Sequence, residues 1–345
     1  MGWEYNNEDS AVFTISGLTK PRPGGDSDMA TTKVHPGYKA FAGQHGGATA
    51  LHRFAVLLAI CTLFLVVAGA SVTSNQAGLS VPDWPLSYGQ VMPEMRDGVF
   101  YEHGHRMIAS FVGFLTIILA VWIWKVEDRR WLKWLGLAAL AGVILQGLLG
   151  GMTVLFLLPP AISIAHACLA QIFFSTTVAL ALFTSPGWRG EPLAVDDAGW
   201  PSMRSLAMLM PLLVLAQIAL GAGYRHRVFG IMPHVLGAIV VGTMLLAFAV
   251  FVLVQYQEHS SLRGTAWSLA GITFVQLLLG VMAFMARVSS LDALQPSATT
   301  VVSTVAHVGG GALTVGATVA LSLQIFRHVR AARQTMHSGG VPVAS

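Results

Sequence analysis

Apolar runs of about twenty residues alternate with short polar segments between positions 54 and 325 of the chain. A helix needs about 20 apolar residues to cross the roughly 30 Å hydrocarbon core of a bilayer. The pattern therefore predicts an all-α integral membrane protein with eight transmembrane helices. We expect these helices at 54–73, 105–124, 134–154, 161–183, 205–222, 233–255, 266–286 and 301–325.

The composition agrees with this fold class. Of 345 residues, 54% are hydrophobic and 10% are charged, whereas a typical soluble domain has about 25% charged residues. The formal charge of +4 comes from basic residues at the segment ends. These clusters lack the aromatic interleaving of a nucleic-acid surface, so we expect the lipid bilayer as their counterpart and no nucleic acid. Cys61 and Cys168 fall at different depths of the predicted spans, which predicts free thiols.

Basic residues also predict the orientation of the chain. They lie before the first span (Lys33, Lys39, Arg53), after the second (Lys125, Arg129, Arg130, Lys133) and after the eighth (Arg327, Arg330, Arg333). An excess of Lys and Arg marks the cytoplasmic side, so we expect both termini there. The polar segment 1–50 is expected to be a disordered cytoplasmic tail without a signal peptide, and 333–345 a second tail.

The chain also contains an internal repeat. Gln-x-x-Leu-Gly occurs three times, at Gln146–Gly150, Gln217–Gly221 and Gln276–Gly280. We predict two four-helix bundles, 51–186 and 205–332, connected by a linker at 187–204. An even number of spans in each half makes this a parallel repeat. The alternative is chance recurrence of the small-residue motifs that let membrane helices pack closely.

Four histidines occupy matching places in the two halves: His105 and His166 in the first, His234 and His307 in the second. An ionisable side chain within a membrane segment is costly and indicates a functional site. Side chains on facing helices of a bundle build cofactor sites, so each pair suits an iron held between two imidazoles, as in haem proteins. Small residues such as Gly237 would admit a flat macrocycle, although ordinary helix packing explains them nearly as well.

The two halves differ next to the first histidine. Glu102 lies three residues before His105 and so shares its helical face, whereas the second half has Ile231 in that place. A carboxylate there could act as a base or stabilise a developing cation. The alternative is a structural role, in an ion pair with Arg106 or at a helix N-terminus. We therefore predict a reactive site in the first half and a redox cofactor site in the second.

Arg225 and Arg227 fall on the predicted outer side, against the usual charge distribution. They are candidates to bind haem propionates near His234, because Arg pairs with carboxylates in a bidentate manner. Arg106 is the corresponding candidate in the first half. The long outer loop 71–100 is rich in Pro, Trp and Gly and is a candidate lid for the first site.

Together these features resemble the haem A synthase family over residues 50–330. The resemblance is carried by Gly78–Leu86 (GLSVPDWPL), Glu102-x-x-His105-Arg106, Gln146–Gly150, Ile164–His166, Gly223–His226, His234 and His307. It implies a polytopic enzyme that oxidises the C8 methyl group of haem O to the formyl group of haem A, for cytochrome c oxidase. The reaction implied is successive hydroxylation and loss of water, with electrons from a separate donor.

The resemblance also implies roles for individual residues. His234 and His307 would bind the iron of haem b, His105 and His166 the iron of the substrate haem O, and Glu102 would be the family's essential glutamate. It further implies the bacterial inner membrane as location, with haem O synthase and cytochrome oxidase assembly factors as possible partners. Some members carry a cysteine pair in an outer loop; Ser87 stands in that context here, so no thiol chemistry is expected in the loop.

Other functions fit fewer of these features. A dihaem b-type electron-transfer cytochrome needs the four histidines but not Glu102, and a haem-handling membrane protein or transporter needs no catalytic acid. A prenyl transferase would need paired Asp motifs on helices to hold magnesium diphosphate. The only such pair, Asp196 and Asp197, lies in the linker.

Overall fold

The structure is a computed structural model that describes residues 37–197, 200–289 and 295–330, with side chains from residue 49. Eight of its helices are long and apolar enough to cross a membrane, which confirms the predicted number. They are α1 (Gly37–Ser74), α2 (Asp97–Val126), α3 (Arg130–Leu155), α4 (Pro160–Thr184), α6 (Met203–Arg225), α7 (Met232–Gln255), α8 (Ser260–Val288) and α9 (Ala298–His328). The predicted spans are the apolar centres of these longer helices.

The predicted terminal tails are largely outside the described residues. Helix α1 already begins at Gly37, within the segment that we expected to be a disordered tail, while residues 1–36 and 331–345 are not described. Residues 37–43 belong to a separate unit with the chain before them. The second unit begins at Gln44 and contains the other described residues.

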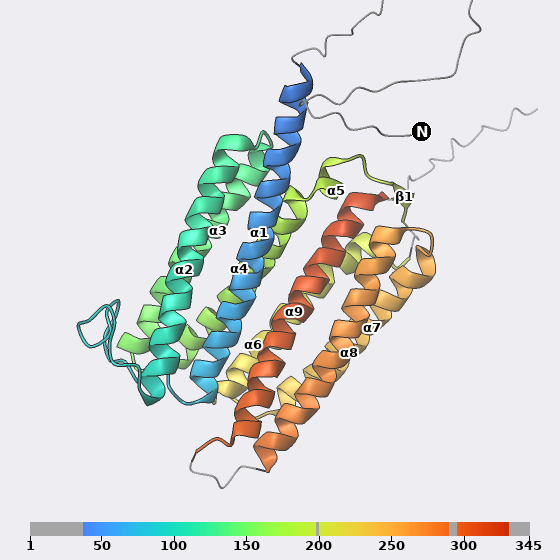
Figure 1. The fold of residues 1–345 in the computed structure, drawn as a ribbon. Coiled ribbons are helices and arrows are strands. Elements are labelled where there is room, and N and C mark those ends of the chain that lie inside the picture. Colours follow the sequence, from blue (N-terminus) through green and yellow to red (C-terminus); the bar gives the residue numbers. More distant parts are fainter. Residues whose placement is uncertain (1–36, 198–199, 290–294, 331–345) are drawn as a thin grey trace, which may run out of the picture. The chain divides into compact units, whose positions relative to one another are not determined.

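The helices of this unit form two sets of four, α1–α4 and α6–α9 (Figure 1). In the second set each helix packs against the next along the chain and α9 returns to α6. In the first set α2, α3 and α4 are consecutive neighbours, and α1 closes the set. Phe54 lies beside Trp122 of α2, and Nδ1 of His52 is 2.9 Å from the carbonyl oxygen of Ala181 in α4.

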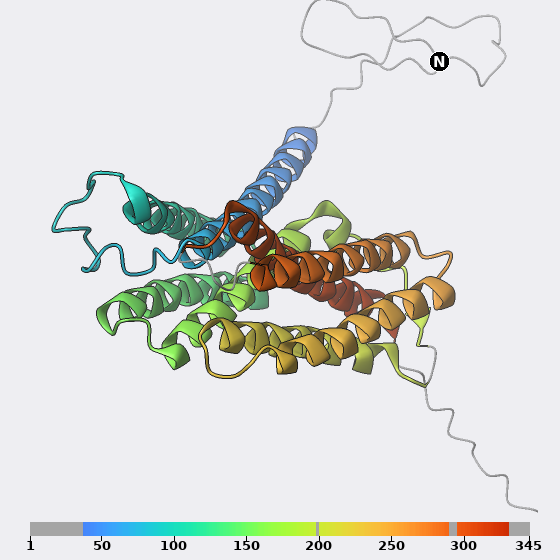
Figure 2. The ribbon, with the colours of Figure 1, turned by 90° about the horizontal axis from the view of Figure 1, so that it is seen from below.

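The two sets meet along α4, which packs against both α6 and α9 (Figure 2). Val67 of α1 also approaches Gly309 of α9 at this junction. The grouping is the one expected for two four-helix bundles. The parallel relation between the halves and the cytoplasmic position of both termini remain predictions.

Each set encloses its own apolar core. The core of the first set includes Leu58, Leu119, Ile123, Leu132 and Leu180, and that of the second Met210, Leu245, Leu269, Leu321 and Ile325. Large apolar side chains such as Phe64 and Trp134 are exposed on the outside, at 69% and 64%. Water would not solvate such a surface favourably, so it identifies a multi-pass membrane protein. Cys61 and Cys168 are free thiols, as predicted.

The segment between the two sets is fixed by hydrogen bonds to α9. It contains α5 (Pro186–Arg189) and β1 (Val195–Asp196), and β1 pairs in parallel with β2 (Val329–Arg330). Two buried imidazoles, of His259 and His328, lie 3.0 and 3.1 Å from the carbonyl oxygen of Leu193. The loop of residues 75–96 joins α1 to α2. The contacts of Leu193 anchor the segment at the opposite end of the helices from this loop.

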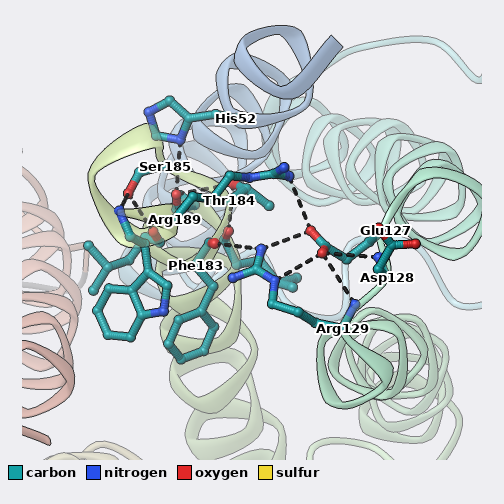
Figure 3. Close-up of polar contacts among 12 residues, drawn as sticks. His52, Glu127, Asp128, Arg129, Phe183, Thr184, Ser185 and Arg189 are labelled. Carbon is teal, nitrogen blue, oxygen red and sulfur yellow. Dashed lines mark hydrogen bonds and ion pairs between the residues drawn. The ribbon is translucent and has the colours of Figure 1, made fainter. Parts of the chain in front are cut away.

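A buried carboxylate joins the elements of the first set at the same end. Glu127, which ends α2, accepts hydrogen bonds from Arg129 at 2.8 and 2.9 Å and from Arg189 of α5 at 3.2 Å (Figure 3). Arg129 also donates to the carbonyl of Phe183 in α4. The hydrogen bonds from Arg129, despite the desolvation of the carboxylate, lower the pKa of Glu127 below its ordinary value.

We expect Glu127→Gln to lower the free energy of unfolding by roughly 1–3 kcal/mol, because two guanidinium groups lose their charged acceptor. Thermal unfolding in detergent measures this loss, with exposed Glu258→Gln as the control. Because folding lowers the pKa of Glu127, its stabilisation is complete above the ordinary value of 4.5 and disappears as pH falls through the lowered pKa. The difference between wild type and variant should therefore shrink on acidification, and a difference that stays constant would contradict this role.

Candidate functional site

All four candidate histidines lie at one end of the two helix sets, near the N-termini of α2, α4, α7 and α9. His105 is two turns inside α2, because that helix begins at Asp97 and not at the predicted start of the span. In each set the histidine-bearing helices alternate with the others around the ring. Their histidines can therefore face one another across the interior.

The two rings of the second pair are separated by a distance that suits two ligands to one metal. The ring centroids of His234 and His307 are 6.0 Å apart, and their planes are nearly perpendicular at 84°. A metal–imidazole bond is about 2 Å long and a ring centre lies about 1 Å behind its nitrogen, so two axial imidazoles have centres roughly 6 Å apart. Within the described ranges no group of three or more His, Cys, Asp or Glu residues could hold a metal ion. A pair of donors is what axial ligation of a haem needs.

The first pair is also brought together. His105 and His166 interact electrostatically with each other. The Nδ1 atom of each ring is buried and has no hydrogen-bond partner in the described part of the chain. Buried polar atoms are normally hydrogen-bonded, so unsatisfied imidazole nitrogens at this place suit a site that receives a further group.

Each of the four imidazoles packs against a glycine of the preceding long helix. A methyl group built on that glycine would lie 2.8–3.2 Å from the Cε1 atom of the ring, closer than side chains normally approach. The pairs are Gly69 with His105, Gly150 with His166, Gly221 with His234 and Gly280 with His307. These supports were not predicted from the sequence, although three of the glycines end the Gln-x-x-Leu-Gly repeats.

The glutamines of the same repeats hold the histidines of the next helix. The Nε2 atom of Gln217 donates to the carbonyl of His234 at 2.8 Å and lies 3.0 Å from its Nδ1 atom. Gln276 approaches Nδ1 of His307 at 3.2 Å. Gln146 donates to the carbonyl of His166 at 3.0 Å. Gln and Gly, four residues apart, share one helical face, so the repeat is a support for the adjacent histidine.

The small residues after the second pair make room for these glutamines. A side chain at Gly237 would overlap the amide oxygen of Gln217, and one at Gly310 would overlap that of Gln276. Gly237 is therefore explained by close helix packing against Gln217, and not by space for a macrocycle as the sequence suggested.

Glu102 is buried, at 4% exposure, and both of its oxygens are hydrogen-bonded. Oε1 accepts from Arg106 at 2.6 Å, and Oε2 accepts from the backbone N–H of Val81 at 2.9 Å. The ion pair with Arg106 is thus present. The carboxylate of Glu102 is thereby fixed between α2 and the 75–96 loop. A direct role of Glu102 in catalysis remains a prediction.

Arg106 fastens the same loop. Its guanidinium donates to the carbonyls of Asp83 and Leu86 at 2.8 and 2.9 Å, so these bonds occupy the group that we proposed as a propionate ligand. His103 lies 2.8 Å through Nδ1 from the buried hydroxyl of Ser87, another residue of this loop.

The loop also reaches α3 beside the first histidine pair. The indole of Trp84 lies where a side chain on Gly151 would be, and Gly151 follows the glycine that supports His166. The loop is therefore attached to α2 and to α3, next to both histidines of the first pair. The loop between α6 and α7 is much shorter, at 226–231.

The other two candidate propionate ligands lie at the C-terminal end of α6 and in the loop that follows it. Arg225 is half-buried and interacts electrostatically with Arg287, while Arg227 is exposed. Within the described residues no carboxylate forms an ion pair with Arg225 or Arg227. Burial and the neighbouring Arg225 lower the pKa of His226, which interacts electrostatically with His166 of the first set.

These features define a multi-pass membrane protein with two unlike histidine pairs at one end of eight helices. The profile of one family, described as cytochrome oxidase assembly protein (COX15-CtaA), matches residues 52–233, just over half of the chain. The chain belongs to this family. The matched range includes Glu102, His105 and His166 but ends one residue before His234, so the second pair rests on the structure.

Curated relatives agree with this assignment. Proteins named heme A synthase from Alkalihalophilus pseudofirmus and Halalkalibacterium halodurans are each 32% identical to it, over 144 and 158 residues. These matches cover 41% of this chain in both cases, and 48% and 53% of the relatives. A heme A synthase from Symbiobacterium thermophilum is 30% identical over 175 residues, 48% of this chain and 55% of that protein. The chain thus spans about half the length of the curated relatives it matches.

Proposed function

We propose that this protein is a haem A synthase, which oxidises the C8 methyl group of haem O to a formyl group for cytochrome c oxidase. The observation that carries the proposal is the contrast between the two histidine pairs. The first lies beside a long loop fastened by Glu102 and Arg106, whereas the corresponding loop of the second set, at 226–231, is much shorter. The named relatives support the same activity.

The second pair would hold haem b as a cofactor, with His234 and His307 as ligands to its iron. The 6.0 Å separation of the rings fits this group. When bound, a haem of this kind supplies one-electron transfer. Arg225 and Arg227, which have no carboxylate partner within the described residues, would bind its propionates.

The first pair would bind the substrate haem O through His105 and His166. The Glu102 carboxylate, oriented by Arg106 and Val81, would stabilise positive charge or accept a proton near the reacting methyl group. The 75–96 loop would exclude water from the site. We further propose domains at 51–186 for the substrate and 205–332 for the cofactor, and a bacterial inner membrane location. A separate electron donor, haem O synthase and oxidase assembly factors are the proposed partners.

The test is haem extraction and chromatography from membranes of cells that make haem O but lack their own haem A synthase. We expect wild type to accumulate haem A. We expect Glu102→Gln to accumulate haem O or a hydroxylated intermediate, with haem A reduced by about 100-fold, a typical contribution of a positioned acid or base. Glu94→Gln is the matched control, because that side chain is 68% exposed.

The spectrum of the same membranes separates the alternatives. The Glu102→Gln variant should keep the haem b absorption of the second site, since the hydrogen bonds of Glu102 to Val81 and Arg106 lie within the first set and its loop. If wild type binds haem b but leaves haem O unchanged, the protein is a dihaem cytochrome or a haem carrier, and the proposal is wrong.

A further inference from the structure

The four histidine supports are alike except at His105. In α3, α6 and α8 a glutamine lies one turn before the supporting glycine. In α1 the residue one turn before Gly69 is Leu65. His105 is thus the one candidate ligand whose support offers no amide.

The residue that replaces the glutamine beside His105 is buried, so the lost hydrogen bond is not easily restored. Leu65 is 9% exposed and packs in the apolar core of the first set, so water cannot easily replace the missing amide. Among the described residues, Nδ1 of His105 is buried without a hydrogen bond, whereas the amide groups of Gln217 and Gln276 lie within 3.2 Å of Nδ1 of His234 and of His307. An imidazole that ligates through Nε2 carries its proton on Nδ1, so the amide of Gln217 or Gln276 would turn to present its oxygen, which is buried without a hydrogen bond within the described ranges. A hydrogen bond from the second nitrogen of a ligating imidazole fixes the orientation of the ring.

In the first set, His166 is therefore hydrogen-bonded by a glutamine, whereas His105 has no such support. Gln146 anchors His166 through its carbonyl oxygen at 3.0 Å, and its approach to the ring is longer, at 3.4 Å to Nε2. The second set has two rings approached at Nδ1. Ring restraint thus decreases from the second pair to His166 and then to His105.

We propose that these supports set how long each site keeps its haem. Gln217 and Gln276 are positioning residues that retain the cofactor, and Leu65 leaves His105 free to turn, so that substrate haem enters and product haem leaves by breaking the bond to His105. The second part of this inference rests on the proposed function. Its first part concerns haem retention alone.

The test exchanges the supports and measures haem release without turnover. Purified protein is loaded with ferric protohaem, and transfer of the haem to excess apomyoglobin is followed by absorbance. We expect a fast phase from the first site, absent in His105→Ala, and a slow phase from the second. Leu65→Gln should slow the fast phase about tenfold, as expected for adding a hydrogen bond to a ligand. Leu65→Met, which has no amide, should not.

The reciprocal variants keep the inference falsifiable if Leu65→Gln folds poorly. Gln146→Leu should speed haem release in the fast phase. Gln217→Leu should speed release in the slow phase about tenfold and shift the midpoint potential of the haem in the second site. Equal rates in Leu65→Gln and Leu65→Met, or an unchanged slow phase in Gln217→Leu, would overturn the proposal.

Turnover separates this inference from the proposed function. In cells that make haem O, Leu65→Gln should lower haem A output and leave haem A bound to the protein. If wild type makes haem A but the support variants release haem at wild-type rates, only this inference fails. If wild type makes no haem A, the proposed function fails, and with it the role of His105 in product release.

Discussion

His307→Ala is expected to lower the haem content of the second site at least about tenfold and to abolish its six-coordinate low-spin absorption. One of two ligands is lost, and the remaining ring of His234 cannot complete axial ligation alone. The difference spectrum of reduced and oxidised protein, with the haem content per chain, measures both effects. His105→Ala should leave this absorption in place, because it belongs to the other pair.

Two variants of α8 give a finer version of the same test. Gly280→Ala places a methyl group 3.1 Å from Cε1 of His307, so the ring must move by a few tenths of an ångström. Gly271→Ala meets nothing within 4 Å and should be neutral or stabilising, since alanine favours a helix by up to about 1 kcal/mol. Haem loss in Gly280→Ala but not in Gly271→Ala is the expected result. Equal behaviour would mean that the glycine does not position the ligand.

Hydropathy alone predicted the number of helices, because length and lack of charge decide whether a segment can cross a bilayer. The ends of the helices were less predictable. The helix hydrogen bonds continue through Asp97–Gly104, where hydropathy is low, and His105 consequently lies inside α2. The pairing of His234 with His307 followed from the predicted four-helix bundle, since side chains at the same end of its facing helices can meet in the interior.

Contacts between distant segments were not predictable from spacing. The bond between Glu102 and the N–H of Val81 joins residues 21 apart, and it depends on how the loop folds. The support of His234 by Gln217 and Gly221 was visible in the sequence only as a recurring motif. A motif on one helix shows which residues share a face, and only the packing shows what that face touches.

The second large effect is expected at Arg106. Arg106→Met leaves the buried carboxylate of Glu102 with the N–H of Val81 as its one remaining partner, and the loop loses its bonds at Asp83 and Leu86. Removing one partner of a buried ion pair destabilises by about 3–5 kcal/mol. We expect faster proteolysis of the 75–96 loop and at least about tenfold less haem A. Arg96→Met is the control, because that side chain is 75% exposed.

Combining Arg106→Met with Glu102→Gln distinguishes two roles of the glutamate. If Glu102 acts only by holding the loop, each single variant should expose the loop to protease, and the double variant should lose little further activity, because both changes break one interaction. In Glu102→Gln one of the two acceptor oxygens becomes an NH2 donor, so the side chain can no longer accept from both Val81 and Arg106 in the present geometry. If the carboxylate also contacts the reacting haem, Glu102→Gln should therefore lose far more haem A production than Arg106→Met at the same degree of loop exposure. A protected loop with wild-type haem A production in Glu102→Gln would exclude both roles for its charge.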